Sequence, residues 1–215
     1  MENQSLILMG MPLGEMQTNG YILGNTETKE AYVFDPGDEA HAVLDVIKEK
    51  GLVLSGIILT HGHFDHILGV DELKKQAGRE LPVYANIEEK PVFENDQYSL
   101  CSMVGQKHEF MPDHYVSDGE KLNLCGTTIS CIHTPGHTSG GMCYYIAEKN
   151  WLIAGDTLFQ GSIGRTDFPT GSFQELSDAI KEKIYTLPDD TKVFPGHGPS
   201  TTIGDEKMHN MFVHL

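Results

Sequence analysis

The first sixty residues alternate between apolar and polar positions in a way that predicts several strands and one helix. Alternating runs predict strands at roughly 6–9, 18–24 and 31–35. A helix is predicted from near Asp38 to Gly51, because apolar residues recur at helical spacing at Val43, Leu44, Val46 and Ile47. The apolar run at 55–59 then predicts a buried strand.

A second helix is predicted at roughly 65–77, where Gly78 provides the glycine that commonly ends a helix. Residues 82–85 follow as a short strand. The segment 86–118 contains short apolar patches and scattered charge, and it shows no repeat. We therefore expect this segment to form short helical turns that cross between two halves of the molecule.

The second half has a similar order of elements. Its apolar runs predict strands near 120–124, 127–133, 141–147 and 151–155. A helix begins at Ser172, with Glu175 in a capping-box pattern, and a strand at 191–195 and a short helix from about 204 complete the chain. These elements predict an α/β fold with sheets in the middle and helices outside. The length of 215 residues fits one large domain, spanning 1–215, better than two.

The chain is strongly acidic, with 31 Asp and Glu against 15 Lys and Arg and a formal charge of −16. Nucleic-acid-binding proteins usually carry a basic stripe, so this balance argues against RNA or DNA as a partner. No apolar stretch approaches the roughly 18–20 residues that a membrane span needs. Met1 to Met16 contain no basic residue ahead of an apolar core, so we expect a cytoplasmic protein without a secretory signal.

The most informative motif is the run Thr-His-Gly-His-Phe-Asp-His at 60–66, which places four metal-competent side chains close together: His61, His63, Asp65 and His66. Their spacing follows neither the helical nor the strand repeat, so packing does not explain it. The strand at 55–59 would deliver the cluster to a loop at its C-terminal end, with Asp65 and His66 beginning the next helix. Imidazole and carboxylate together suit zinc or a similar divalent ion.

Three further side chains follow predicted strands in the same way: His137 in Thr-Pro-Gly-His-Thr, Asp156 after the run 151–155, and His197 in Pro-Gly-His-Gly. Ligands of open α/β sheets gather at the carboxyl ends of strands, and neighbouring glycines allow close backbone approach. Seven ligands are too many for one tetrahedral ion and suit two. The alternative is that the two histidines are ordinary loop residues and that the aspartate caps a helix.

The His-x-His-x-Asp-His motif with the later His, Asp and His resembles the metallo-β-lactamase superfamily over the whole chain. The resemblance implies a four-layer αβ/βα sandwich with metals along one edge of its sheets. The implied ligands are His61, His63 and His137 for a first ion, Asp65, His66 and His197 for a second, and Asp156 between the two. Two divalent ions, zinc foremost and iron or manganese as alternatives, would activate a bridging hydroxide. Asp65 is also a candidate catalytic residue, since it could orient this hydroxide.

The stretches 161–169 and 195–204 resemble the short, bacterial, glyoxalase II-like hydrolases. This resemblance implies hydrolysis of a thioester such as S-lactoylglutathione to a hydroxy acid and a free thiol, as in hydroxyacylglutathione hydrolases. The thiolate leaves readily, so little general-acid help is needed. Longer glyoxalase II enzymes carry a helical region after the last histidine that contributes to glutathione binding. Here the sequence ends at Leu215, so we expect any glutathione contact to come from the core loops.

Arg165 lies in the run Gly-Arg-Thr-Asp-Phe at 164–168. Its planar guanidinium suits a substrate carboxylate, which makes it a candidate substrate-binding residue. The competing interpretation is an ion pair with Asp167, two positions later, that shapes the loop. The sequence slightly favours this structural role.

Other functions fit parts of the pattern. Persulfide dioxygenases of the same superfamily also carry a Gly-Arg-Thr-Asp-Phe run, and the resemblance to them implies a single iron held by His61, His137 and Asp156. A lactone hydrolase would use the same chemistry as the thioesterase. A non-catalytic scaffold would be expected to lose some ligands, yet all seven are present. The intact Pro-Gly-His-Gly run around His197 favours the two-metal hydrolase.

Overall fold

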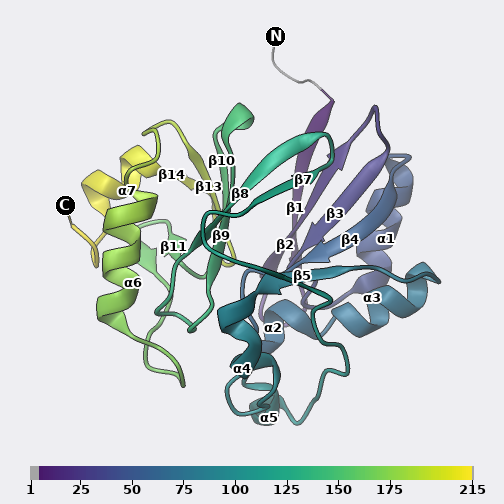
Figure 1. The fold of residues 1–215 in the computed structure, drawn as a ribbon, viewed down its shortest axis with the longest axis horizontal. Helices are drawn as coiled ribbons and strands as arrows, with labels where there is room; N and C mark the ends of the chain where they lie inside the picture. Colours follow the sequence, from purple (N-terminus) through teal and green to yellow (C-terminus); the bar gives the residue numbers. More distant parts are fainter. Residues whose placement is uncertain (1–4, 215) are drawn as a thin grey trace.

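The computed structural model describes residues 5–214, whose strands form two six-stranded sheets and one small hairpin. The first sheet takes its strands from residues 6–116, which lie mainly on the right of Figure 1. In spatial order its strands are β1 (Leu6–Leu13), β2 (Thr18–Asn25), β3 (Glu30–Phe34), β4 (Val53–Ile58), β5 (Val83–Asn86) and β6 (His114–Val116). The pairs from β1 to β3 are antiparallel, and those from β3 to β6 are parallel.

The second sheet takes its strands from the second half of the chain. In spatial order they are β14 (Thr201–Thr202), β13 (Lys192–Pro195), β10 (Trp151–Gly155), β9 (Met142–Ile146), β8 (Thr127–His133) and β7 (Lys121–Leu124). Strands β7 to β10 form an antiparallel meander, and β13 joins β10 in parallel. The small hairpin consists of β11 (Leu158–Phe159) and β12 (Ser162–Ile163).

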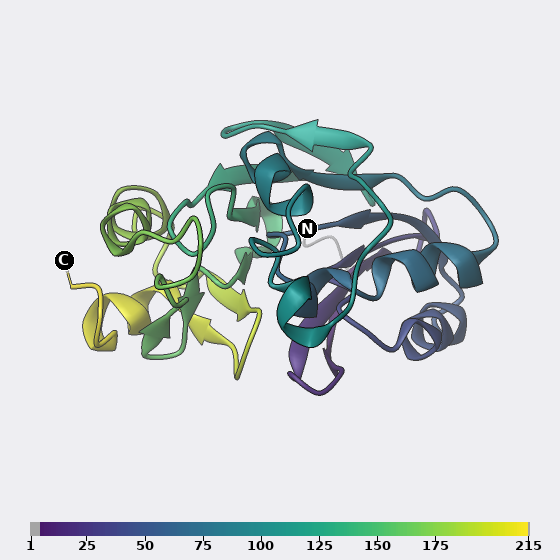
Figure 2. The same cartoon turned by 90° about the horizontal axis from the view of Figure 1, so that it is seen from below.

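Helices cover the outer faces of both sheets, as Figures 1 and 2 show from two directions. On the first sheet these are α1 (Ala40–Glu49) and α3 (Val70–Ala77); on the second they are α6 (Phe173–Ala179), its π-helical continuation η3 (Ile180–Ile184), and α7 (Ile203–His209). Short helical elements join the rest: α2 (Phe64–Ile67), η1 (Ile87–Glu89), α4 (Lys90–Phe93), α5 (Cys101–Val104) and η2 (Ala147–Lys149). None of the helices within 5–214 is long and apolar enough to cross a membrane.

Strand alternation explains why four layers form. In β3, Ala31 and Val33 pack toward α1 and α3, whereas Tyr32 and Phe34 point into the space between the sheets. The ring of Phe34 meets that of Tyr144 edge-on, with the centroids 5.5 Å apart. Because both sheets are apolar on both faces, each is covered by helices on one side and by the other sheet on the other. The predicted four-layer αβ/βα sandwich is confirmed.

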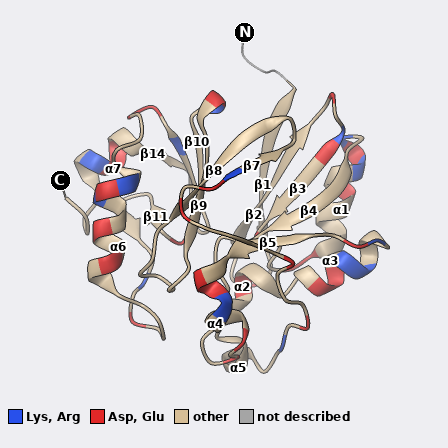
Figure 3. Cartoon of the chain, in the orientation of Figure 1, with Lys and Arg blue, Asp and Glu red and all other residues tan. Residues whose placement is uncertain are grey.

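The charged side chains lie mostly on the covering helices and connecting loops. Figure 3 shows Asp and Glu spread over α1, α3, α4 and α6, while the strands of both sheets are mostly free of charge. This distribution leaves the space between the layers to apolar side chains.

Most predicted elements are present, and the differences have physical causes. The predicted helix at 65–77 is two helices, α2 and α3, separated at Leu68 and Gly69. A Cβ atom on Gly69 would lie 2.3 Å from the carbonyl oxygen of Pro36, so the chain here is shaped by contact with a distant loop. The segment 86–118 contains the expected helical turns, but it also contains β6, an edge strand of three residues.

Candidate metal centre

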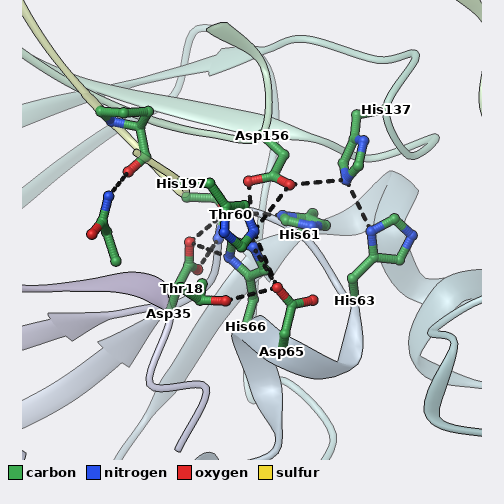
Figure 4. Close-up of polar contacts among 12 residues, drawn as sticks. Thr18, Asp35, Thr60, His61, His63, Asp65, His66, His137, Asp156 and His197 are labelled. Atoms are coloured by element: carbon green, nitrogen blue, oxygen red, sulfur yellow. Dashed lines mark hydrogen bonds and ion pairs between the residues drawn. The ribbon is translucent and has the colours of Figure 1, made fainter. Parts of the chain in front are cut away.

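The seven predicted ligands come together at one edge of the two sheets (Figure 4). They follow four strand ends, in the order β4, β8, β10 and β13. The seven side chains are His61, His63, Asp65, His66, His137, Asp156 and His197. The first sheet therefore supplies the cluster at 61–66 and the second sheet supplies the remaining three. Metal binding by these side chains is predicted from their imidazole and carboxylate groups.

The ligand atoms fall into overlapping groups. His61, His63 and His137 form one group, and Asp65, His66 and His197 form another. A third group, which joins His61 and His66 to Asp156, lies between them. Within each group the ligand atoms lie within 4.8 Å of one another. This division matches the two ion sites that the sequence resemblance implies.

Buried atoms without partners test whether a metal fits here. Among the described residues, His61 Nε2, His63 Nε2, His66 Nε2 and Asp156 Oδ1 are buried and have no hydrogen-bond partner. Buried polar atoms are nearly always paired in native proteins, so four converging exceptions require an explanation. Nitrogen and carboxylate donors at this spacing are the ligands that zinc and related divalent ions prefer. The residues present therefore fit a metal centre.

The first group is held in its neutral, ligand-ready form. Burial lowers the pKa of His63 to about 3 and also lowers the pKa values of His61 and His137, because an imidazolium would be poorly solvated there. Mutual repulsion lowers the pKa values of His61 and His63 further. His137 Nδ1 lies 2.7 Å from the carbonyl oxygen of Arg165, which orients the ring.

In the second group, nearby carboxylates outweigh the effect of burial on the pKa of His66. Burial alone would lower the pKa of His66, but Asp65, Asp156 and Asp35 surround the ring and raise it well above its usual value. Burial would raise the pKa of Asp65, and nearby imidazoles hold it well below its usual range. Asp65 Oδ2 accepts a hydrogen bond of 2.7 Å from the Thr18 hydroxyl and lies 3.2 Å from His197 Nε2.

Asp156 lies between the two groups. Its Oδ1 is 3.4 Å from His66 Nε2, and its Oδ2 is 3.5 Å from His137 Nε2 and 3.6 Å from His197 Nε2. Burial opposes its ionisation, but the surrounding histidines lower its pKa to about 2. A carboxylate that faces ligands of both groups is suited to bridge two cations.

Glycine is required beside this carboxylate. A Cβ atom on Gly196 would lie 2.2 Å from Asp156 Oδ1 and 2.7 Å from His66 Cε1. The Pro-Gly-His-Gly run therefore brings backbone directly against the ligands, which explains the glycine next to His197.

Asp35 supports the site and was missed by the sequence analysis. Its Oδ1 accepts the backbone N–H of Thr60 at 2.8 Å, and its Oδ2 accepts the Thr60 hydroxyl at 2.6 Å. The same Oδ2 lies 3.0 Å from His66 Nδ1, which leaves Nε2 facing the other ligands. The sequence marks Asp35 by the same local pattern as the predicted ligands, because it directly follows a strand, β3, and precedes Pro36-Gly37.

Replacing Asp35 with asparagine is expected to weaken metal binding by about 10–100-fold, because carboxylates that orient ligating histidines typically have effects of this size. Zinc titration against a chromogenic chelator measures the change. Asp45→Asn, at an exposed position on α1, serves as the control and should bind zinc like the wild type. Unchanged affinity in Asp35→Asn would show that His66 is oriented by other contacts.

Arg165 lies near the centre but points to a local partner. Its guanidinium makes two hydrogen bonds of 2.8 Å to Asp167, and it stacks on the ring of Phe168 with Cζ 3.7 Å from the centroid. The Phe168 ring lies 6.0 Å from that of His63. The side chain of Arg165 is 56% exposed. This geometry favours the structural interpretation, in which the ion pair shapes the loop whose backbone orients His137.

Arg165→Ala and Asp167→Ala are expected to have equal effects, each lowering kcat less than about tenfold, since exposed ion pairs contribute little. Steady-state kinetics on one thioester substrate, measured side by side, provides the comparison. A rise in KM in Arg165→Ala, with Asp167→Ala unchanged, would instead indicate that the guanidinium binds substrate.

Comparison with known proteins assigns the family. Residues 13–197 match the sequence profile of the Metallo-beta-lactamase superfamily. The chain is 37% identical to the hydroxyacylglutathione hydrolase GloC of Haemophilus influenzae, over 94% of this chain and 96% of the relative. The crystal structure of the BLEG-1 B3 metallo-beta-lactamase is similar, with a TM-score of 0.89 and 40% identity, covering 96% of this chain and 99% of that one. TTHA1623, solved in a di-iron-bound form, has a TM-score of 0.84 and 33% identity over 95% of this chain and 100% of that one.

The fold and the His/Asp cluster define a metal-dependent hydrolase. The chain belongs to the metallo-β-lactamase superfamily.

Proposed function

We propose that residues 1–215 form a single-domain, binuclear metallohydrolase that cleaves thioesters of the S-lactoylglutathione type. The observation that carries the proposal is the convergence of two ligand groups with Asp156 between them. Zinc is the metal we expect, and the di-iron form of TTHA1623 keeps iron as an alternative. The similarity to GloC, which is named a hydroxyacylglutathione hydrolase, supports the thioester as substrate.

The chain's own residues supply orientation. Two divalent cations held by the two groups would lower the pKa of a shared water and polarise the attacked carbonyl. Asp65 is fixed through one oxygen by Thr18 and lines the neighbouring cleft, so it is placed to orient the attacking water. A thiolate leaving group needs little protonation, which agrees with a first ligand group made of neutral imidazoles.

A cleft of about 540 Å³ beside Asp65 is the proposed binding place of the thiol portion. Leu13, Phe64 and Leu68 give it apolar walls, and Glu15 and Asp38 contribute negative charge. Among the described residues that line this cleft there is no Lys or Arg. The carboxylates of glutathione would gain no ionic partner there, so we propose that thioesters with a neutral thiol portion have lower KM values than S-lactoylglutathione.

A second candidate is β-lactam hydrolysis. The similarity to BLEG-1, which is named a B3 metallo-beta-lactamase, favours it. Thioester and β-lactam carbonyls are attacked by the same kind of nucleophile, so the difference between the two functions lies in the cleft and not in the metal ligands.

The proposal is tested with zinc-loaded protein and four substrates: S-lactoylglutathione, an S-acyl-N-acetylcysteamine, a chromogenic cephalosporin and a γ-lactone. We expect hydrolysis of both thioesters, at rates at least about tenfold above those of the other two. Dominant cephalosporin or lactone hydrolysis would overturn the thioesterase assignment. Oxygen uptake with glutathione persulfide and iron-loaded protein would instead indicate a persulfide dioxygenase.

A further inference from the structure

Glu89 is a buried carboxylate that none of the roles above uses. It ends η1, directly after β5, and only 1% of its surface is exposed. Charged side chains are rarely buried to this extent without a specific partner. The groups that hydrogen-bond to its two oxygens therefore indicate why a carboxylate occupies this position.

The Glu89 carboxylate joins the two loops that carry the first ligand group. Its Oε1 accepts the backbone N–H of Gly62 at 2.7 Å, and Gly62 lies between His61 and His63. Its Oε2 accepts the backbone N–H of Gly140 at 2.7 Å, in the loop between β8 and β9 that carries His137. One loop follows β4 of the first sheet and the other joins β8 and β9 of the second. This one side chain therefore connects the two sheets beside the candidate metal centre.

Neighbouring contacts further restrict the backbone of the two loops around Glu89. The side-chain amide of Asn86 donates to the carbonyl oxygen of Gly140 at 3.0 Å, so both backbone polar groups of Gly140 are held by the segment 86–89. A Cβ atom on Gly140 would lie 2.2 Å from the Glu89 nitrogen. A Cβ atom on Gly62 would lie 3.3 Å from Glu89 Oε1. The Gly140 backbone therefore packs directly on the backbone of Glu89, with no room for a side chain.

An apolar residue would fill this space at lower cost. Burial raises the pKa of Glu89 to about 7, and interactions with the Gly62 N–H, the Thr138 side chain and the Gly140 N–H oppose this rise. Buried charges are often no more stabilising than well-packed apolar groups. A carboxylate with two acceptor oxygens, each bound to a different loop, does what an apolar residue cannot: it fixes the spacing of the loops.

We propose that Glu89 is a positioning residue that holds His61, His63 and His137 at the spacing that the first metal ion requires. This inference rests on one part of the proposed function, namely that His61, His63 and His137 bind a metal ion. We expect Glu89 to act chiefly on the first ligand group, because Gly62 lies between His61 and His63 and Gly140 lies in the loop that carries His137.

Glu89→Gln tests the inference. The carboxamide has nearly the same shape but one acceptor oxygen, and its NH2 group would face the N–H of Gly62 or of Gly140. To separate the two sites, zinc affinity is measured in a His197→Ala background, which impairs the second group, and in a His63→Ala background, which impairs the first. We expect Glu89→Gln to lower affinity about 10–100-fold in the His197→Ala background and less than about twofold in the other.

Glu206→Gln is the matched control. Glu206 is likewise a buried carboxylate, 2% exposed, that accepts a backbone N–H, from Gly161 at 2.9 Å. Its substitution should lower the unfolding temperature as Glu89→Gln does, without changing zinc affinity in either background. An equal loss of affinity at both sites, or none at the first, would overturn the positioning role.

Glu89→Asp provides a second variant if the glutamine protein does not fold. It keeps both acceptor oxygens on a shorter side chain, so it can reach one N–H but not both, and the first site should again weaken selectively. Wild-type affinity in this variant would contradict the inference. Failure of the wild-type protein to bind zinc at all would contradict the proposed function instead.

Discussion

Asp156→Ala is expected to lower kcat/KM for thioester hydrolysis by at least about 10³-fold. Asp156 faces His66, His137 and His197 at 3.4–3.6 Å, so its removal would take a ligand from both of the proposed ion sites at once. Metal-derived stabilisation of the transition state amounts to several kcal/mol, and each 1.36 kcal/mol corresponds to a factor of ten in rate. The measurement is steady-state kinetics on zinc-loaded protein, together with metal content and circular dichroism.

Asp178→Ala is the control for this substitution, because Asp178 lies on α6 and its carboxylate accepts hydrogen bonds from the nearby Gln174. It should retain wild-type activity. Retained turnover in a folded Asp156→Ala protein that still binds metal would show that the carboxylate is not part of the catalytic centre.

Removal of metal by a chelator is expected to abolish hydrolysis and to lower the unfolding temperature on the order of 10 °C. Ligands that bind only the folded state stabilise it by about 4 kcal/mol at 1,000 times their Kd, and for a chain of this size about 1 kcal/mol shifts the midpoint by 2–4 °C. The physical origin would be the buried atoms of His61, His63, His66 and Asp156 that have no hydrogen-bond partner and would gain one when metal binds. Differential scanning fluorimetry with and without chelator measures the shift.

Readdition of zinc should restore both activity and unfolding temperature. In Asp156→Ala the same chelator treatment should produce a much smaller shift, since that protein has lost a shared ligand. An unfolding temperature that does not respond to chelator in the wild type, despite measured metal loss, would mean that the centre contributes no folding energy.

The side chains that converge in the structure could be located from the sequence because they follow apolar strands in runs that contain glycine. This local pattern is visible without knowledge of the fold, and His137 and His197 were found by it although they lie far apart along the chain. The strand period places Tyr32 and Phe34 of β3 on one face, but because both faces are apolar, only the folded structure shows that this face meets the opposite sheet.

The supporting residues could not be located in the same way. Glu89 lies in an irregular segment with no periodicity, and its role depends on two loops that meet only in the folded protein. The break at Gly69 also depends on a distant backbone contact, with Pro36. Strand β6 is three residues long and lies at a sheet edge, too short for alternation to be recognised. Tertiary contacts, and not local preference, decide each of these features.

Metal content per chain tests the central claim most directly. Protein purified without added metal, then incubated with excess zinc and freed of unbound ions, is analysed by mass spectrometry for its metal-to-protein ratio. The seven converging side chains predict two divalent ions per chain, falling to at most one in Asp156→Ala. A wild-type ratio near zero would contradict the metal centre, and a ratio that stays at one would contradict its binuclear form.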